Sequence, residues 1–190
     1  MQRRDVLLAA LAIPAVSRAN ADVESALRAG GLVLLFRHAL APGNYDPPGF
    51  KLGECSSQRN LSEEGRDQAR SIGAWFAARK LQATRVRSSP WCRCIDTARL
   101  AFGDKTESWA ALGSPRAGTE ETNAESLGQL RAALAAAVLK PGGFEVWVSH
   151  MFVISALLGD SATSGEGLLL GVGKDGAPRV IGRFTPAALG

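Results

Sequence analysis

The chain has 190 residues, of which 46% are hydrophobic and 21% are charged, and its formal net charge is +4. This length suits one compact domain with a substantial hydrophobic core. Lysine and arginine form no run, and the tryptophans are not interleaved with basic residues. The composition therefore lacks the electrostatic footprint of a nucleic-acid-binding protein, and we expect no nucleic-acid partner.

The N-terminal segment has the pattern of an export signal. Arg3 and Arg4 precede an apolar stretch at 6–16, and Ala19–Ala21 forms a small-residue cleavage site. The stretch is shorter than the roughly 20 residues that span a bilayer, so we expect no stable membrane insertion. The paired arginines indicate twin-arginine export, and an ordinary Sec signal is the alternative. Either route predicts a periplasmic or secreted protein whose folded domain spans residues 22–190.

Removal of the expected signal peptide, residues 1–21, takes away three basic side chains and one acidic one and leaves a net charge of +2. The mature protein is therefore expected to be nearly neutral. Its three cysteines are Cys55, Cys92 and Cys94, and none stands in a CxxC motif or with histidine at a metal-ligand spacing. In an oxidising compartment Cys55 could pair with Cys92 or with Cys94, and buried unpaired thiols are the alternative.

Two apolar runs predict buried strands, and a histidine follows each of them. The run at 32–36 lacks polar alternation and leads into Arg37 and His38, whereas the run at 144–149 leads directly to His150. These are the two histidines of the whole chain.

The segments between these strands predict helices and loops. Ser62 followed by two glutamates is an N-cap pattern, and Ser88-Ser89-Pro90 precedes a second helix with Arg93 in its first turn. Further helices are predicted at 124–139 and 152–158, further strands at 84–87, 167–172 and 179–184, and loops at 41–60 and 113–124. This alternation predicts a three-layer α/β/α sandwich with a mostly parallel sheet and a ligand site at the carboxyl ends of the strands.

The expected neighbours at that edge are two imidazoles and two guanidinium groups. Planar guanidinium groups suit the oxygens of a transferring phosphoryl group, so Arg37 and Arg93 are candidates for a phosphate clamp. A neutral imidazole can attack phosphorus and form a phosphohistidine, which makes His38 the candidate nucleophile. His150 is then a candidate for donating a second hydrogen bond to the phosphate. We expect a small phosphorylated substrate, with no metal and no cofactor.

Four segments in order resemble the motifs of the histidine phosphatase superfamily, which includes cofactor-dependent phosphoglycerate mutases and acid phosphatases. Leu35–Ala39 is similar to its Arg-His-Gly motif, with Ala39 in place of glycine, and 61–69 is similar to Leu-Thr-x-x-Gly-x-x-Gln-Ala. Residues 88–93 resemble Ser-Ser-Pro-x-x-Arg, and 148–150 resemble the last motif. The resemblance implies a phosphoglycerate mutase-like fold of the branch 1 type. It also implies a phosphorylated His38 in a metal-free pocket of Arg37, Arg93 and His150.

The proton donor to the leaving group is left open by the sequence. Met151 stands where acid phosphatases of the second branch have an aspartate. Glu120 and Glu121, in the loop after the Arg93 helix, are candidates for a general acid, and Glu166 is a rival. The alternative is that all three are solvated loop glutamates. An enzyme without a donor would favour good leaving groups, such as those of phosphohistidine and aryl phosphates.

Other polar and aromatic residues receive no catalytic role. Asn44, Asp46 and Gln58 lie in or near the long loop and could touch substrate hydroxyls, but such residues are usually solvated. The four tryptophans, at 75, 91, 109 and 147, are expected to pack in the core or at its rim.

The leading hypothesis is an exported phosphomonoesterase that acts through a phosphohistidine on His38. Some exported members of the resembling superfamily act on heptose phosphates of the lipopolysaccharide core, and an envelope-derived phosphate is expected here by analogy. A mutase is disfavoured because its cofactor is cytosolic. The alternative is a catalytically silent phosphate-binding or scaffold domain of the same fold. The sequence leaves the oligomeric state open.

Overall fold

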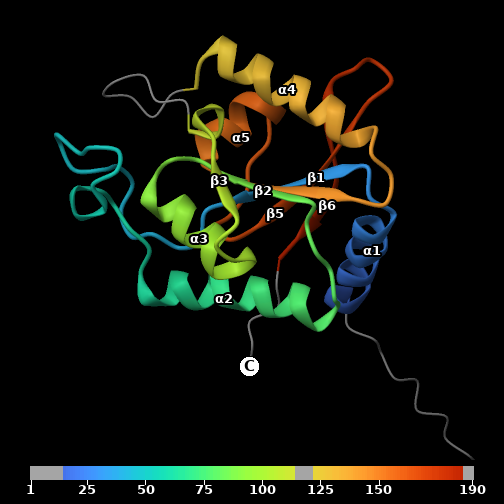
Figure 1. Ribbon diagram of the computed structural model, residues 1–190, viewed down its shortest axis with the longest axis horizontal. Coiled ribbons are helices and arrows are strands. Elements are labelled where there is room, and N and C mark those ends of the chain that lie inside the picture. The colour runs from blue at the N-terminus through green and yellow to red at the C-terminus, as the bar shows by residue number, and fades with distance from the viewer. Residues whose placement is uncertain (1–14, 114–121, 186–190) are drawn as a thin grey trace, which may run out of the picture.

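The computed structural model describes residues 15–113 and 122–185. A six-stranded sheet runs through its middle in the order β3-β2-β4-β1-β5-β6 (Figure 1). The strands are β1 (Leu32–Arg37), β2 (Arg85–Ser88), β3 (Thr106–Ser108), β4 (Phe144–Ser149), β5 (Gly167–Val172) and β6 (Pro178–Phe184). Strands β1 to β4 are mutually parallel, whereas β5 is antiparallel to both of its neighbours.

Helices cover both faces of the sheet. They are α1 (Ala15–Ala29), α2 (Glu63–Ala78), α3 (Cys92–Phe102), α4 (Ala124–Val138) and α5 (Met151–Leu158). In Figure 1, α4 and α5 lie above the sheet, and α1, α2 and α3 lie below it. The predicted three-layer α/β/α sandwich with a mostly parallel sheet is therefore confirmed.

Strand β1 shows why its sequence lacks polar alternation. Leu34 and Phe36 pack in the core between the sheet and helices α2 and α3. Val33 and Leu35 pack in the core on the other face, between the sheet and helices α4 and α5. All four side chains are fully buried. A central strand with a hydrophobic layer on each face needs apolar residues at every position.

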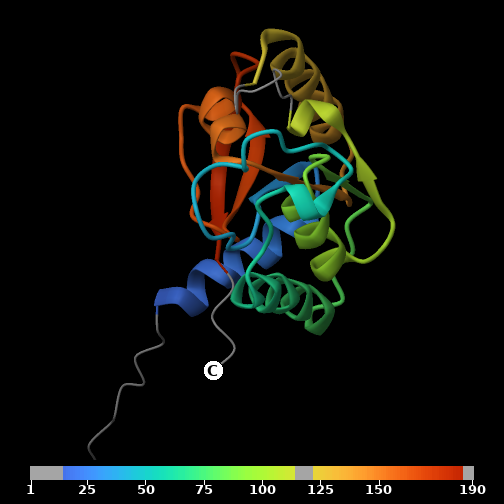
Figure 2. The same ribbon diagram turned by 90° about the vertical axis from the view of Figure 1, so that its left-hand side faces the viewer.

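The register of β1 and β4 brings the two histidines to one edge. The strands pair in parallel from Leu32 opposite Phe144 to Arg37 opposite Ser149, so the next residue of each strand is a histidine. Figure 2 turns this edge towards the viewer and shows the loop between β1 and α2 crossing in front of the strands. The sheet edge predicted to carry the site is the one that this loop covers.

The start of α2 is fixed against the chain that follows β1. The side chain of Ser62 accepts a hydrogen bond from the Gly65 backbone, as its N-cap pattern predicts. A Cβ atom at Gly65 would lie 2.0 Å from the backbone oxygen of Leu40, so this close approach requires glycine. The Gln68 side chain accepts from the Leu40 backbone at 3.0 Å. These contacts explain why a Gly-x-x-Gln pattern stands at this helix.

Some elements differ from the sequence prediction. Strand β3 and the 3-10 helices η1 (Cys55–Ser57) and η2 (Ala110–Leu112) were not predicted, because three-residue elements carry too little periodicity. Helix α1 runs through the expected cleavage position after Ala21. Of the residues that cleavage there would retain, Val23 and Leu27 are buried against the sheet. Cleavage at residue 21 stays a prediction.

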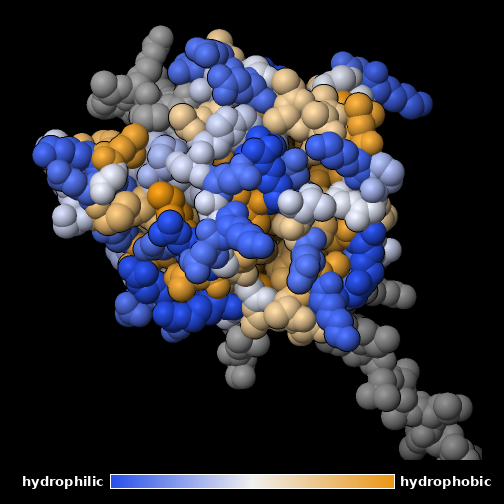
Figure 3. Space-filling model, viewed as in Figure 1, coloured by the Kyte–Doolittle hydropathy of each residue, from blue (hydrophilic) through white to orange (hydrophobic). Residues whose placement is uncertain are grey.

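The surface shows mixed polarity. Hydrophilic and hydrophobic residues are interspersed over the face seen in Figure 3. Among the residues whose exposure is described, the exposed large hydrophobic ones are Tyr45 and Leu52 in the loop between β1 and α2, Leu139 after α4, and Ile181 in β6. Within the described part of the chain, no helix has both the length and the apolar character needed to cross a membrane.

Candidate active site

His38 is held in one tautomer at the end of β1. Its Nδ1 lies 2.8 Å from the backbone oxygen of Ala39, and a carbonyl can only accept, so Nδ1 carries the proton. The other ring nitrogen, Nε2, therefore keeps its lone pair. Burial lowers the pKa of His38 to about 3, against the opposing effect of the Ala39 hydrogen bond and with help from the nearby arginines. The imidazole is neutral at physiological pH, as a nucleophile must be.

His150 lies beside His38, with 5.5 Å between the two ring centroids. Its Nδ1 is 3.3 Å from Arg93 Nη2, and a guanidinium only donates, so Nδ1 accepts. The proton then lies on Nε2, which is 2.8 Å from Ser89 Oγ. Burial first, and the charge of Arg93 second, lower the pKa of His150 well below its usual value. Phe152 stacks on the ring at 5.1 Å.

Arg37 is the first cation of the site. Its Nη1 donates to the backbone oxygen of Ala162 at 3.0 Å, and burial lowers the pKa of the guanidinium. Its Nε is buried and has no hydrogen-bond partner among the residues that the structure describes. One edge of this guanidinium thus retains hydrogen-bonding capacity for an anion.

Arg93 is positioned differently from the expectation of an open clamp. Its side chain is fully buried, and its Nη1 lies 2.9 Å from both carboxylate oxygens of Asp46. Asp46 also accepts hydrogen bonds from the Trp91 indole at 3.1 Å and from the Arg59 backbone at 2.8 Å. The sequence assigned Asp46 no role and expected it to be solvated, which is wrong.

A cavity of about 270 Å³ lies against the two histidines. Its lining residues are Arg37, His38, Asn44, Tyr45, Arg59, His150, Met151 and Phe152. Arg59 is a functional candidate that the sequence analysis missed. Its Nη1 donates to the backbone oxygens of Ala41 and Gly43, and its charge lowers the pKa of both histidines. No spacing in the sequence connects Arg59 to the histidines, because its place depends on how the long loop folds back.

A disulfide joins that loop to the start of α3. Cys55 is bonded to Cys92, whereas Cys94 is a free and buried thiol. Of the alternatives left open by the sequence, the pairing with Cys92 is therefore the one formed. The Gln58 side chain reinforces the connection, because its Oε1 accepts a hydrogen bond from the Cys92 backbone at 3.0 Å. Gln58 is buried, so the expectation of a solvated side chain is also wrong here.

The candidate proton donors divide into two groups. Glu120 and Glu121 lie outside the described residues. Burial favours a raised pKa for Glu166, but hydrogen bonds from Thr163 and Arg183 outweigh it and hold the pKa below its usual value. A carboxylate stabilised in its charged form is a poor general acid. The structure thus argues against Glu166 as the donor.

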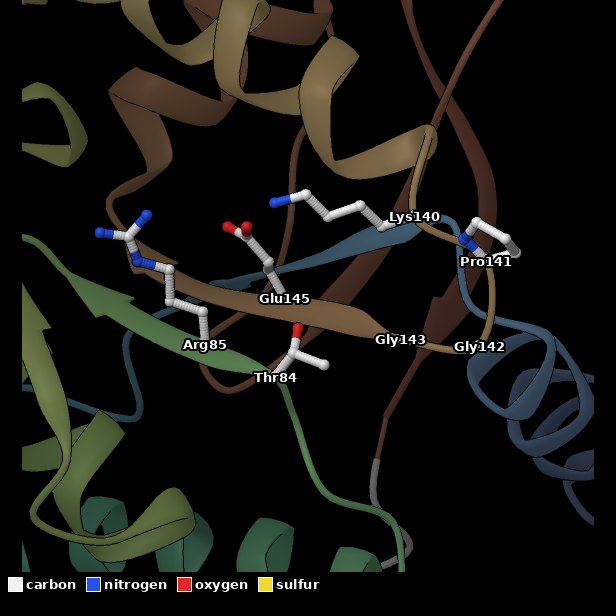
Figure 4. A pocket seen from close by; sticks show the side chains of 7 residues that line it. All are labelled: Thr84, Arg85, Lys140, Pro141, Gly142, Gly143 and Glu145. Carbon is white, nitrogen blue, oxygen red and sulfur yellow. The ribbon is translucent and has the colours of Figure 1, made fainter.

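A second cavity, of about 320 Å³, lies at the opposite edge of the sheet (Figure 4). It is lined by Thr84, Arg85, Lys140, Pro141, Gly142, Gly143 and Glu145. Two of its charged groups are already paired, since Arg85 binds Glu107 and Glu145 binds Arg87. Although this cavity is the larger one, it contains no histidine, and the chemistry favours the cavity beside His38.

The site thus combines two neutral imidazoles and several guanidinium groups at the carboxyl edge of the central sheet of a three-layer α/β/α sandwich. The model of the histidine phosphatase superfamily (branch 1) matches residues 33–112, which include the first three motifs. The resemblance indicated by the sequence is thus confirmed over these residues. None of the curated proteins matches the sequence significantly.

Solved structures share the fold. The protein histidine phosphatase SixA complexed with tungstate is 18% identical, has a TM-score of 0.58, and the match covers 84% of this chain and 99% of that one. A phosphoserine phosphatase from Entamoeba histolytica in complex with phosphoserine is 16% identical, with a TM-score of 0.60 and coverages of 83% and 98%. A mycobacterial glucosyl-3-phosphoglycerate phosphatase with inorganic phosphate is 17% identical, with a TM-score of 0.55 and coverages of 83% and 97%.

Proposed function

We propose that this protein is a phosphatase that hydrolyses phosphate monoesters through a covalent phosphohistidine on His38. The observation that carries the proposal is the tautomer of His38, whose Nδ1 donates to Ala39 and leaves the Nε2 lone pair for attack. The depressed pKa of His38, about 3, keeps that lone pair unprotonated at neutral pH. The match of residues 33–112 to the model of the histidine phosphatase superfamily supports the same reaction class.

The reaction proceeds in two balanced displacements. In the first, His38 Nε2 forms a bond to phosphorus while the phosphorus–oxygen bond to the leaving group breaks, and the leaving oxygen keeps the electron pair and takes up a proton from solvent water. In the second, water attacks phosphorus and gives up a proton to solvent, the nitrogen–phosphorus bond breaks, and its electron pair returns to Nε2. Inorganic phosphate is released and His38 is regenerated.

The surrounding cations stabilise the charge on the equatorial oxygens. Arg37 and Arg59 line the cavity beside His38, and we assign both to phosphate binding. His150 also lines the cavity, and we assign it to phosphate binding together with the buried Arg93, which donates to its Nδ1. Ser89 holds His150 by the hydrogen bond to Nε2.

The leaving group is expected to be a weak base. Among the described residues that line the cavity, there is no aspartate or glutamate to protonate a departing alkoxide. Aryl phosphates and phosphohistidine have good leaving groups that need little help from an acid of the protein, so they are the proposed substrates. An envelope-derived sugar phosphate remains the physiological proposal by analogy, and it would require a donor such as Glu120 or Glu121.

Export to the periplasm or the exterior is part of the proposal. The leader pattern of residues 1–21 supports it, and so does the Cys55–Cys92 disulfide, because such bonds persist in oxidising compartments. A peptide map of the protein secreted from its native host tests this point. An N-terminus at Asp22 would support the proposal, and an intact N-terminus in the cytosolic fraction would refute it.

A catalytically silent phosphate-binding domain is the second candidate. The observation that favours it is the burial of Arg93 against Asp46. Tungstate binding by calorimetry and hydrolysis of 4-nitrophenyl phosphate distinguish the two. An enzyme binds tungstate and turns over, and its His38→Ala variant loses turnover. A silent domain binds tungstate without turnover.

A further inference from the structure

The loop between β1 and α2 contacts three consecutive residues at the start of α3. Asp46 binds the Trp91 indole, Cys55 is bonded to Cys92, and Asp46 is paired with Arg93. The neighbouring helix start has no side-chain cap of its own. The loop is therefore fastened to the segment that carries Arg93.

The carboxylate of Asp46 restricts how the Arg93 guanidinium can turn. Both of its oxygens accept hydrogen bonds from Arg93 Nη1 at 2.9 Å. The Asp46 side chain is 2% exposed and the Arg93 side chain is 0% exposed. With Nη1 fixed in this way, Nη2 lies 3.3 Å from His150 Nδ1. The planar guanidinium keeps these two nitrogens in fixed relative positions. The orientation of the group that faces His150 thus depends on a residue of the loop.

We propose that Asp46 is a positioning residue for the reaction: it orients Arg93, and through Arg93 it orients His150, so that both face the phosphoryl group. The inference rests on the proposed function, since it assigns Arg93 and His150 to phosphate binding. Asp46 is not among the described residues that line the cavity beside His38. It acts through Arg93.

Simple electrostatics makes the opposite prediction. A carboxylate beside the site weakens its attraction for anions, so removal of that charge would tighten the binding of an oxyanion. A positioning role requires the reverse. A guanidinium that loses the Asp46 carboxylate is less restricted in its orientation, and a misplacement of about 1 Å can cost about 100-fold in rate.

The structure supplies a matched control in a second buried pair. Glu145 binds Arg87 and also accepts a hydrogen bond from the Trp147 indole at 3.0 Å. This arrangement repeats the partners of Asp46, a guanidinium and an indole, at the opposite edge of the sheet. Glu145→Gln therefore perturbs a similar buried pair without touching the site.

The test compares Asp46→Asn with Glu145→Gln in the full domain. Tungstate affinity by calorimetry, KM and kcat for 4-nitrophenyl phosphate, and Tm are measured for both. We expect Asp46→Asn to weaken tungstate about tenfold and to lower kcat/KM about 100-fold. Glu145→Gln should lower Tm and leave the tungstate affinity and KM unchanged. Unchanged or tighter tungstate binding by Asp46→Asn would overturn the proposal.

Two further variants keep the test decisive. If Asp46→Asn does not fold, Asp46→Glu is used instead, because it retains the charge but moves it by one methylene. The proposal predicts that Asp46→Glu binds tungstate more weakly than the wild type does. Binding as tight as that of the wild type would refute the proposal. In an Arg93→Ala background, substitution of Asp46 should cost no further affinity, because its effect runs through Arg93. A full additional loss there would also refute it. Tungstate binding needs no turnover, so these outcomes are separable from failure of the phosphatase proposal.

Discussion

Reduction of the Cys55–Cys92 disulfide should lower the free energy of unfolding by about 4 kcal/mol. The bond joins residues 37 positions apart. The loop-closure entropy of a chain of that length is about 13 cal/mol/K, which corresponds to about 4 kcal/mol at 25 °C. The reduced protein should therefore unfold at a clearly lower denaturant concentration.

Urea denaturation with and without a phosphine reductant measures this loss. The Cys55→Ser/Cys92→Ser variant is the control, because it lacks the bond and keeps the buried Cys94. Its unfolding should not respond to the reductant. If thiol counting shows that the wild-type bond is reduced and the unfolding midpoint does not move, the reasoning is refuted. A reductant effect of equal size in the control would refute it as well.

Three more predictions test the site and its support. Gly65→Ala should destabilise the protein by about 1–3 kcal/mol in urea melts, because the new Cβ would collide with a backbone oxygen of the preceding loop. Gly128→Ala is the control and should not destabilise the protein, because a Cβ there meets nothing within 4 Å. Arg59→Ala should weaken tungstate binding about tenfold by calorimetry, and Arg70→Ala, at an exposed ion pair on α2, should leave it unchanged. Stability should fall as the pH drops from 6.5 towards 3, by up to about 1.4 kcal/mol per pH unit from His38, because the unfolded state binds the proton that the buried imidazole resists. His38→Ala should flatten this part of the pH profile, and an unaltered slope would contradict the assigned pKa.

The sheet and the two histidines could be predicted because their signals are local. An apolar run without alternation determines β1 and β4, and the residue after each run is a histidine. Ser62 and the glutamates after it likewise predicted the start of α2. These patterns depend on a few neighbouring residues, and the parallel pairing then brings the strand ends together.

The loop contacts could not be predicted because their partners are distant in the sequence. Asp46 meets Arg93 across 47 positions, and nothing near either residue indicates the pairing. The pairing of Cys55 with Cys92 and not with Cys94 follows from the orientation of the two residues on α3, which the structure shows. Residues two apart on a helix point to opposite sides, so Cys92 faces the loop while Cys94 faces His150 in the interior.

Chemical trapping of the intermediate tests the central proposal most directly. The purified protein is mixed with a ³²P-labelled aryl phosphate and quenched in denaturant, and the label is examined for stability in base and in acid. We predict a base-stable, acid-labile label on wild-type protein that is lost in His38→Ala, although this variant remains folded. An equally labelled His38→Ala variant, or turnover by the wild type with no trapped label, would contradict the assignment of His38 as the nucleophile.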